Sequence, residues 1–435
     1  MRVKGALFSR HCWGGLKSCK IVCLQESLTT MKSNLPKLRD DLELIPTSYQ
    51  GQKAVIVSDS LGLIRNPIVL QGDALNLVGL INGRNDIPDI QFEIVRRQGG
   101  VFVSRESVER LVAELDAAFL LDSERYRAAK QGLRDEYTRL EVRRASHAGQ
   151  AYPSSKEKLE KYLDSILSLG REAHSGENGK KVLALVAPHI DFEAGKKAYA
   201  KAYGALQGPA PSKILLLGTG HHLEEGFFSL TEKDFKTPLG LARTDKAFVK
   251  ELRIAGGSAV AADDLAHRRE HSLEFQLLFL QKIFGAGFSI VPVLCSSFQG
   301  ELSKVSLPSQ IPGVDAFLGV LADRLAVSGQ SILVVAGVDF SHIGPKFGHR
   351  RSASSLVPEA EKHDRALIEA CLRGDVEAFW AESRRVKDEY NVCGFSALAG
   401  LLEILPRTEG RLLDYDIWME AATQSAVSFA AMAFY

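Results

Sequence analysis

Cysteine is scarce in most of this 435-residue sequence. Three of its six Cys lie within the first 23 residues, and the rest of the chain holds only Cys295, Cys371 and Cys393. Three thiols spread this thinly exclude a disulfide framework of the kind that secreted domains use. We therefore expect a reducing compartment, the cytoplasm.

Long apolar runs and an excess of one charge are also missing. No stretch approaches the roughly 18–20 apolar residues that a membrane span needs. Lys plus Arg number 54 against 53 Asp plus Glu, a net charge of +1, which argues against a nucleic-acid-binding surface. With 45% apolar and 25% charged residues, the composition is that of a globular protein. We expect neither a membrane nor a nucleic acid as partner.

Residues 1–30 differ in composition from the rest of the chain. They hold five basic residues against the single Glu26, and their longest apolar run, Ile21–Leu24, is too short for a secretory signal. We expect either a targeting segment or an extension from an upstream start codon, with Met31 as the working start.

Residues 31–140 predict a small α+β unit. Residues 53–57 and 101–103 are typical of short strands, and 74–81 and 87–98 of helices. Ser104 is placed to cap a further helix, and 123–143 predicts a charged helical linker. The unit lacks His and Cys, so we expect a docking or structural module. Its layout resembles the PqqD-like peptide-binding winged helix.

Residues 145–435 predict a larger α/β domain. Four aliphatic runs, each followed by polar residues, are typical of strands buried on both faces of a mostly parallel sheet: 182–187, 214–217, 288–294 and 332–335. Helical patterns at 194–203, 265–284 and 314–327 lie between them. This alternation predicts a three-layer α/β fold.

Ten of the eleven His lie in this second part, several of them directly after a predicted strand. His189, His221 with His222, and Asp339 with His342 follow three different strands. Because open α/β sheets bind ligands beyond the carboxyl ends of their strands, we expect a shared pocket. Imidazole and carboxylate groups favour a divalent transition metal.

Cys393 could add a thiolate to that pocket. Two His and a carboxylate would favour non-haem iron, whereas a thiolate shifts the preference toward zinc, copper or thiolate-bound iron. Gly394, which follows Cys393, permits a close backbone approach of the kind that a pocket wall needs.

The segment His267-Arg-Arg-Glu270-His271 has two interpretations. On one helix, His267 and His271 would lie one turn apart and could bind zinc, as in inverted zinc peptidases. Alternatively, Glu270, His271 and Glu274 line the strand-end pocket.

Several of these segments together resemble the Memo family. The resemblance rests on six blocks in order: 145–153, 187–190, 217–222, 270–274, 338–342 and Cys393-Gly394. The sequence resembles microbial Memo-like proteins, protein B of the AmmeMemoRadiSam system, and the resemblance covers about residues 145–435.

This resemblance implies a fold like that of class III extradiol dioxygenases, with a metal pocket. The matching metal ligands are His189, His221 and Cys393, and the metal would be iron or copper, with zinc possible. We expect catalytic groups at His342, Asp339, Glu274 and His271. His342 would act as acid and base, and Asp339 or Glu274 would orient the imidazoles.

Two functions are compatible with this resemblance, and the sequence leaves both open. The protein is either a non-haem metal-dependent oxidoreductase, or a non-catalytic accessory protein that serves a radical SAM partner. Expected partners are a small-molecule or peptide ligand, the radical SAM protein and AMMECR-like proteins of the same system. The zinc peptidase is a third, weaker hypothesis.

Three positions depart from the family pattern. Asp191 follows His189 by two residues and could be a ligand, a base or a helix cap. Phe192 replaces a Tyr that could donate a proton to substrate, and Gln276 replaces a His found in some members. These departures bear on which substrate or peptide the pocket accepts.

Overall fold

The structure is a computed structural model that describes residues 35–49, 51–97, 103–170, 181–327 and 331–435. Residues 1–30, and most of the strand expected at 101–103, lie outside this range. The chain forms two compact units, residues 1–133 and 134–435. Within the described ranges, no helix combines the length and the apolar character that crossing a bilayer requires.

The first unit contains a three-stranded antiparallel sheet in the order β1-β2-β3. The strand predicted at 53–57 is the central one. The strands are β1 (Leu42–Tyr49), β2 (Gln52–Asp59) and β3 (Ile68–Gln71). The helices are α1 (Asp73–Val78), α2 (Ile87–Arg97), α3 (Arg105–Ala117) and α4 (Glu124–Thr138), and the division between the two units falls within α4.

The start of α3 confirms the predicted cap. The Ser104 side chain accepts a hydrogen bond from the Ser107 backbone N–H at 3.2 Å, which satisfies one of the amides that a helix start leaves unpaired. Val108 and Leu115, on one face of this helix, are buried in the core of the unit with Ile90 and Ile94 of α2.

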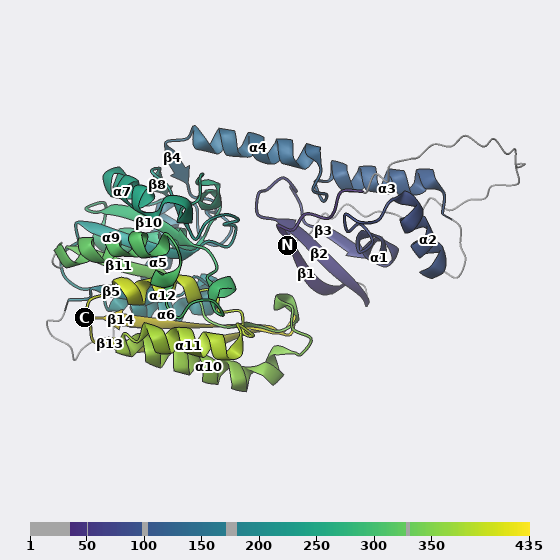
Figure 1. The fold of residues 1–435 in the computed structure, drawn as a ribbon. Helices are drawn as coiled ribbons and strands as arrows, with labels where there is room; N and C mark the ends of the chain where they lie inside the picture. Colours follow the sequence, from purple (N-terminus) through teal and green to yellow (C-terminus); the bar gives the residue numbers. More distant parts are fainter. Residues whose placement is uncertain (1–34, 50, 98–102, 171–180, 328–330) are drawn as a thin grey trace, which may run out of the picture. The chain divides into compact units, whose positions relative to one another are not determined.

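The second unit is built on a large mixed sheet with a parallel centre (Figure 1). The four predicted strands lie side by side in the order β5-β11-β6-β10 and run parallel. They are β5 (Ala184–Ala187), β11 (Ile332–Gly337), β6 (Lys213–Thr219) and β10 (Ser289–Cys295). The prediction of a mostly parallel α/β sheet is thus confirmed for the centre.

The flanking strands were not predicted. The C-terminal hairpin pairs antiparallel to β5 and so closes one side of the parallel centre. The flanking strands are β4 (Val142–Arg144), β7 (Phe228–Leu230), β8 (Asp234–Thr237), β9 (Gly240–Thr244), β12 (His342–Ile343), β13 (Gly410–Glu420) and β14 (Ser425–Phe434).

Helices cover both faces of this sheet. Alternate residues of β6 point to opposite sides, so Leu215 and Leu217 enter one core and Ile214 and Leu216 the other. One core contains α5 (Lys156–Leu167), α6 (Phe192–Gly204) and α8 (Ser272–Phe284); the other contains α7 (Lys246–Gly256), α9 (Val314–Val327), α10 (Ala353–Arg373), α11 (Val376–Val386) and α12 (Phe395–Ile404). Aliphatic runs buried on both faces require this arrangement.

The single helix expected at 265–284 is wrong. Residues Leu265–Arg268 form a short 3₁₀ helix, and α8 begins only at Ser272. The physical reason is the buried carboxylate of Glu270, whose Oε1 accepts the backbone N–H groups of His271 and Ser272, both at 2.9 Å. A side chain that takes up the amides of a helix start breaks the chain into two segments there.

Candidate metal centre

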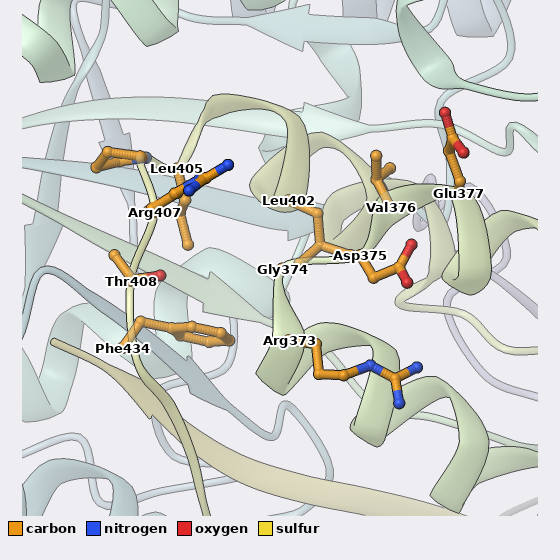
Figure 2. A pocket seen from close by; sticks show the side chains of 11 residues that line it. Arg373, Gly374, Asp375, Val376, Glu377, Leu402, Leu405, Arg407, Thr408 and Phe434 are labelled. Carbon is orange, nitrogen blue, oxygen red and sulfur yellow. The ribbon is translucent and has the colours of Figure 1, made fainter.

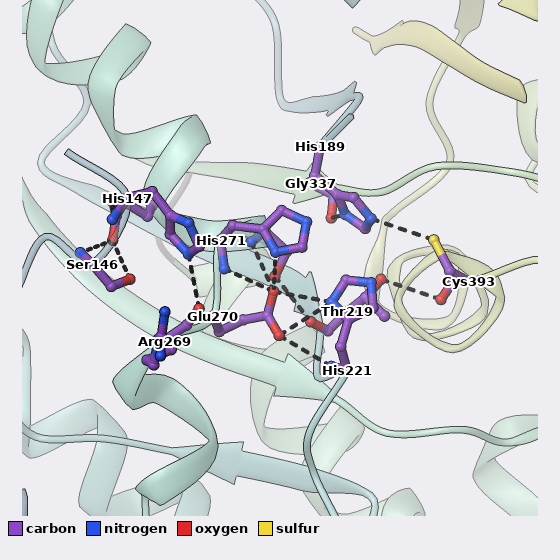
Figure 3. Close-up of polar contacts among 12 residues, drawn as sticks. Ser146, His147, His189, Thr219, His221, Arg269, Glu270, His271, Gly337 and Cys393 are labelled. Carbon is purple, nitrogen blue, oxygen red and sulfur yellow. Dashed lines mark hydrogen bonds and ion pairs between the residues drawn. The ribbon is translucent and has the colours of Figure 1, made fainter. Parts of the chain in front are cut away.

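Segments that are far apart in the sequence meet beyond the carboxyl ends of the central strands. His189 follows β5, His221 follows β6, and Cys393 lies two residues before α12, which packs against β6, β10 and β11. One donor atom from each of His189, His221 and Cys393 lies within 4.8 Å of the others (Figure 3). The structure therefore brings together the three residues that the sequence resemblance marks as metal ligands.

The His189 ring is held in one orientation. Its Nδ1 lies 2.9 Å from the carbonyl oxygen of Gly337, and its backbone N–H donates to Asp339 Oδ1 at 2.9 Å. A ring whose Nδ1–H donates to a carbonyl keeps the lone pair of Nε2 available. Nε2 lies 3.4 Å from Cys393 Sγ (Figure 3).

His221 is fixed in the same manner by a carboxylate. Its Nδ1 lies 3.1 and 3.2 Å from the two oxygens of Glu270, and its backbone N–H donates to Glu270 Oε2 at 3.1 Å. A carboxylate behind an imidazole sets the tautomer and increases the basicity of the opposite nitrogen. The centroids of the His189 and His221 rings are 5.0 Å apart, so both rings face one small space.

Charges in this space favour a thiolate. Burial works against ionisation of Cys393, but the neighbouring His189 and His342 outweigh it and hold the pKa of Cys393 well below its ordinary value of 9.0. Burial likewise disfavours a charged His189, yet Asp339 and Cys393 raise the pKa of His189 to about 9. Two imidazoles and a thiolate form a donor set suited to a transition metal.

Asp339 and His342 lie beside this group rather than in it. Asp339 Oδ2 is 3.6 Å from His189 Nε2, and burial raises the pKa of Asp339 although His189 opposes the shift. His342 is half-buried, with Nδ1 2.9 Å from the carbonyl oxygen of Phe340. Its charge acts on both Asp339 and Cys393.

A second group of possible donors shares His221. It consists of His221, Glu270 and His271, again with donor atoms within 4.8 Å of one another. The His271 ring stacks on that of His221 at 4.9 Å with an interplanar angle of 14°. The sequence indicated that Glu270 could lie near the pocket, but not that it orients His221.

A family profile described as Memo-like protein matches residues 143–433. The chain belongs to the Memo family. The match covers the second unit, including both candidate donor groups, and stops short of the first.

Individual relatives of the Memo family extend the similarity. A MEMO1 family protein of Aquifex aeolicus is 30% identical over 380 residues, which is 87% of this chain and 96% of the relative. This alignment is longer than the segment 143–433 that the family profile matches, so it also includes part of the chain before residue 143. MEMO1 family protein TTHA0924 of Thermus thermophilus is 29% identical over 78% of this chain and 96% of the relative. A relative from Nitrosopumilus maritimus is 27% identical over 67% of this chain and 99% of its own length.

One solved structure, an uncharacterized protein JW3007 from Escherichia coli K12, covers 58% of this chain and 99% of its own, with 13% identity and a TM-score of 0.35. A similarity at this level does not define the fold of the Memo-like unit.

Two departures from the Memo pattern have structural explanations. Asp191 caps α6, because its Oδ1 accepts the Glu193 N–H at 2.9 Å, and its own side chain is exposed. Phe192 is fully buried and packs against Phe275, with ring centroids 4.5 Å apart.

Gln276 ties two segments together in the core. Its Nε2 donates to the Pro188 carbonyl at 2.9 Å, and its Oε1 accepts from the Tyr203 hydroxyl at 2.6 Å. Pro188 immediately precedes His189, so Gln276 supports the loop that carries a donor.

Glu274, expected among the catalytic residues, is fully buried and engaged by the segment at 143–152. It pairs with Arg143, and its oxygens accept from the Ser146 N–H at 2.9 Å, the His147 N–H at 3.0 Å and the Tyr152 hydroxyl. These contacts use the acceptor positions of the carboxylate and fix His147, whose ring lies 5.7 Å from that of His271. No role could be predicted from the sequence for Arg143, His147 or Tyr152, because only the fold reveals that all three contact Glu274.

The zinc-peptidase pair is not formed. Because the expected helix is interrupted before Ser272, His267 and His271 do not lie one turn apart. His267 is buried, with Nε2 3.0 Å from the Ser229 carbonyl, and it belongs to neither donor group among the described residues.

A cavity of about 740 Å³ lies elsewhere, at the junction of α10, α11, α12 and the end of β14 (Figure 2). Arg373, Arg407 and Phe434 line it with neighbouring residues. Phe434 pairs with Ala184, the first residue of β5, whereas His189 follows the other end of that strand. The cavity contains none of the expected site residues.

Proposed function

We propose that this protein binds a transition metal ion through His189, His221 and Cys393 and uses it as a non-haem, dioxygenase-like oxidoreductase. The observation that carries the proposal is the convergence of these three donors from three separate segments. Both His rings have Nδ1 engaged by Gly337 or Glu270, which leaves Nε2 for the metal. The donor set fits iron, copper or zinc.

Such an ion would supply Lewis acidity and, if iron or copper, a means of transferring electrons. The chain itself provides the surroundings. We propose that Asp339 orients His189, and that His342, with its ring half-buried beside Asp339 and Cys393, holds or moves a proton at Nε2. We assign Glu274 to positioning the 143–152 segment, since its oxygens are engaged there.

Metal binding is tested by cobalt substitution and elemental analysis of anaerobically purified protein. The thiolate of Cys393 should give a charge-transfer absorption with Co²⁺, lost in Cys393→Ser and in His189→Ala. His222→Ala is the matched control, because His222 is adjacent in sequence but belongs to neither donor group. A cobalt spectrum that is unchanged in Cys393→Ser would contradict the assignment.

Catalysis is tested separately by oxygen uptake. Iron-loaded protein is mixed with a panel of catechols, and His342→Ala should lose the uptake while its metal content is unchanged. Oxygen uptake that persists in His342→Ala would show that the reaction does not require His342.

The second candidate is an accessory role beside a radical SAM protein and AMMECR-like partners of the AmmeMemoRadiSam system, with a small molecule or peptide held by the protein. It is favoured by the first unit, which has its own sheet and core but no His or Cys within 31–140. The test is to express the chain with a radical SAM protein and measure co-purification, with residues 134–435 alone as comparison. No complex with the full chain would argue against this role.

A further inference from the structure

The His271 ring has no role in the metal position proposed above. It stacks on His221 with ring centroids 4.9 Å apart, and its Nδ1 lies 3.3 Å from Glu270 Oε1. In the described part of the chain, this ring donates or accepts no hydrogen bond, although its backbone N–H donates to Glu270. The ring therefore brings a nitrogen donor to within 3.3 Å of a buried carboxylate oxygen, and both are atoms that a divalent cation can bind.

We propose that Glu270, His271 and Nδ1 of His221 form a second cation position, so that His221 bridges two metal ions. The proposal rests on the first metal position proposed above, because the two share His221. The three residues have donor atoms within 4.8 Å of one another.

The geometry separates the two positions on opposite edges of the His221 ring. Nδ1 faces Glu270 at 3.1 Å, whereas the other nitrogen is left for the group with His189 and Cys393. The second ion would replace the Nδ1 proton of His221, which leaves to solvent, since metal ligands must be deprotonated. The Nδ1 lone pair then binds the ion. The Glu270 oxygens, which accepted the Nδ1 proton before, bind the ion as well.

The negative charge of Glu270 favours a cation at this second position. Glu270 is 2% exposed and lies at the start of α8, where the helix dipole alone would repel a cation. Its carboxylate supplies the negative charge that offsets this repulsion. The donor set contains two nitrogens and oxygen but no sulfur, so it suits zinc, cobalt, manganese or iron rather than copper(I).

The experiment is a Co²⁺ titration of the metal-free, full-length protein, followed by absorption and by elemental analysis. We expect two ions per chain, of which only one gives the thiolate charge-transfer band. His271→Ala should bind one ion and keep the band; Cys393→Ser should bind one ion and lose the band. His222→Ala should still bind two.

Glu270→Gln serves as a second variant in case His271→Ala folds poorly, with circular dichroism as the check on folding. It should lose the second ion; the thiolate band is not read in this variant, because Glu270 also orients His221. Two ions bound by both His271→Ala and Glu270→Gln would overturn the second position and leave the first intact. A single ion in the unmodified protein that disappears in His271→Ala, with no thiolate band, would overturn the first position instead.

Discussion

His189 Nε2 and Cys393 Sγ lie 3.4 Å apart although 204 positions separate them in the sequence. The contact joins the end of β5 to the start of α12. Because each group stabilises the charged form of the other, the pair has chemical properties that neither residue would have alone.

The reactivity of Cys393 should follow from this pair. Burial opposes the thiolate, but His189 and His342 hold the pKa of Cys393 well below 9.0, so its reaction with iodoacetamide should decline at lower pH than that of an ordinary cysteine. Bound metal should block the reaction. Intact-mass measurement on a variant with Cys12, Cys19 and Cys23 replaced by Ser should show one adduct.

Cys295 and Cys371 are the internal controls for that measurement. Both are buried, and burial raises the pKa of Cys295 to about 12 and that of Cys371 further. Modification of either one before Cys393 would contradict the prediction.

Gly394→Ala should disturb the site through the backbone. A Cβ at Gly394 would lie 2.6 Å from the Asp339 carbonyl oxygen, while its N–H already donates to that oxygen at 3.0 Å. Relief requires a shift of the segment that carries Cys393, at a cost of about 1–3 kcal/mol in unfolding free energy. Thermal melts and the Co²⁺ band would report it.

Gly400→Ala, within α12, is the control, since the nearest atom to its added Cβ is 3.6 Å away. Equal loss of the cobalt band in both variants would show that the close contact with Asp339 is not the cause.

Glu274→Gln should make the free energy of unfolding less dependent on pH. Burial would raise the pKa of Glu274, but Arg143 and the hydrogen bonds from Tyr152 and Ser146 lower it from 4.5 to about 2. A depressed folded-state pKa stabilises the protein above pH 4.5, and this contribution disappears as the pH falls through 2. We expect Glu274→Gln to lose on the order of 3 kcal/mol at pH 7.

The measurement is denaturant unfolding of both proteins between pH 7 and pH 3. The difference between them should narrow below about pH 4.5, and Glu225→Gln, an exposed position, should show no such trend. A difference that is constant over this range would rule out the ionised Glu274 as its source.

Asp364→Ala should loosen the loop that carries Asp339 and His342. This buried carboxylate in α10 accepts hydroxyl hydrogen bonds from Ser341 at 2.7 Å, Ser428 at 2.5 Å and Tyr415 at 2.9 Å. Removing it leaves buried hydroxyls without their acceptor, at a cost of roughly 3 kcal/mol.

Asp364→Asn keeps one acceptor oxygen and should lose less stability, as urea unfolding would show. The same or greater loss in the Asn variant would contradict a hydrogen-bonding role.

The parallel centre of the fold was predictable from the sequence because its strands are continuous aliphatic runs. The strands β7, β8 and β9 are short and mixed in composition, and they take their form from pairing with their neighbours. The C-terminal hairpin was missed for a similar reason, since β14 is rich in Ala and Ser.

His189 and His221 could be identified as candidates because strand-end residues in such sheets converge, whereas the assignment of Cys393 as a ligand came from the resemblance to the Memo family. The residues that hold these ligands in position could not be identified from the sequence. The carboxylate of Glu270 interrupts an apparently continuous helical pattern, and that of Glu274 is engaged by a segment more than a hundred residues earlier. Neither interaction leaves a local signal in the sequence.

The distribution of the donors also has a consequence for biosynthesis. A ribosome must have released the chain as far as Cys393, 204 positions after His189, before these two residues can meet, and domains generally fold as units as they emerge. Binding of the proposed metal would then follow synthesis of the whole segment from His189 to Cys393, and chains terminated before Cys393 should be unable to retain the ion.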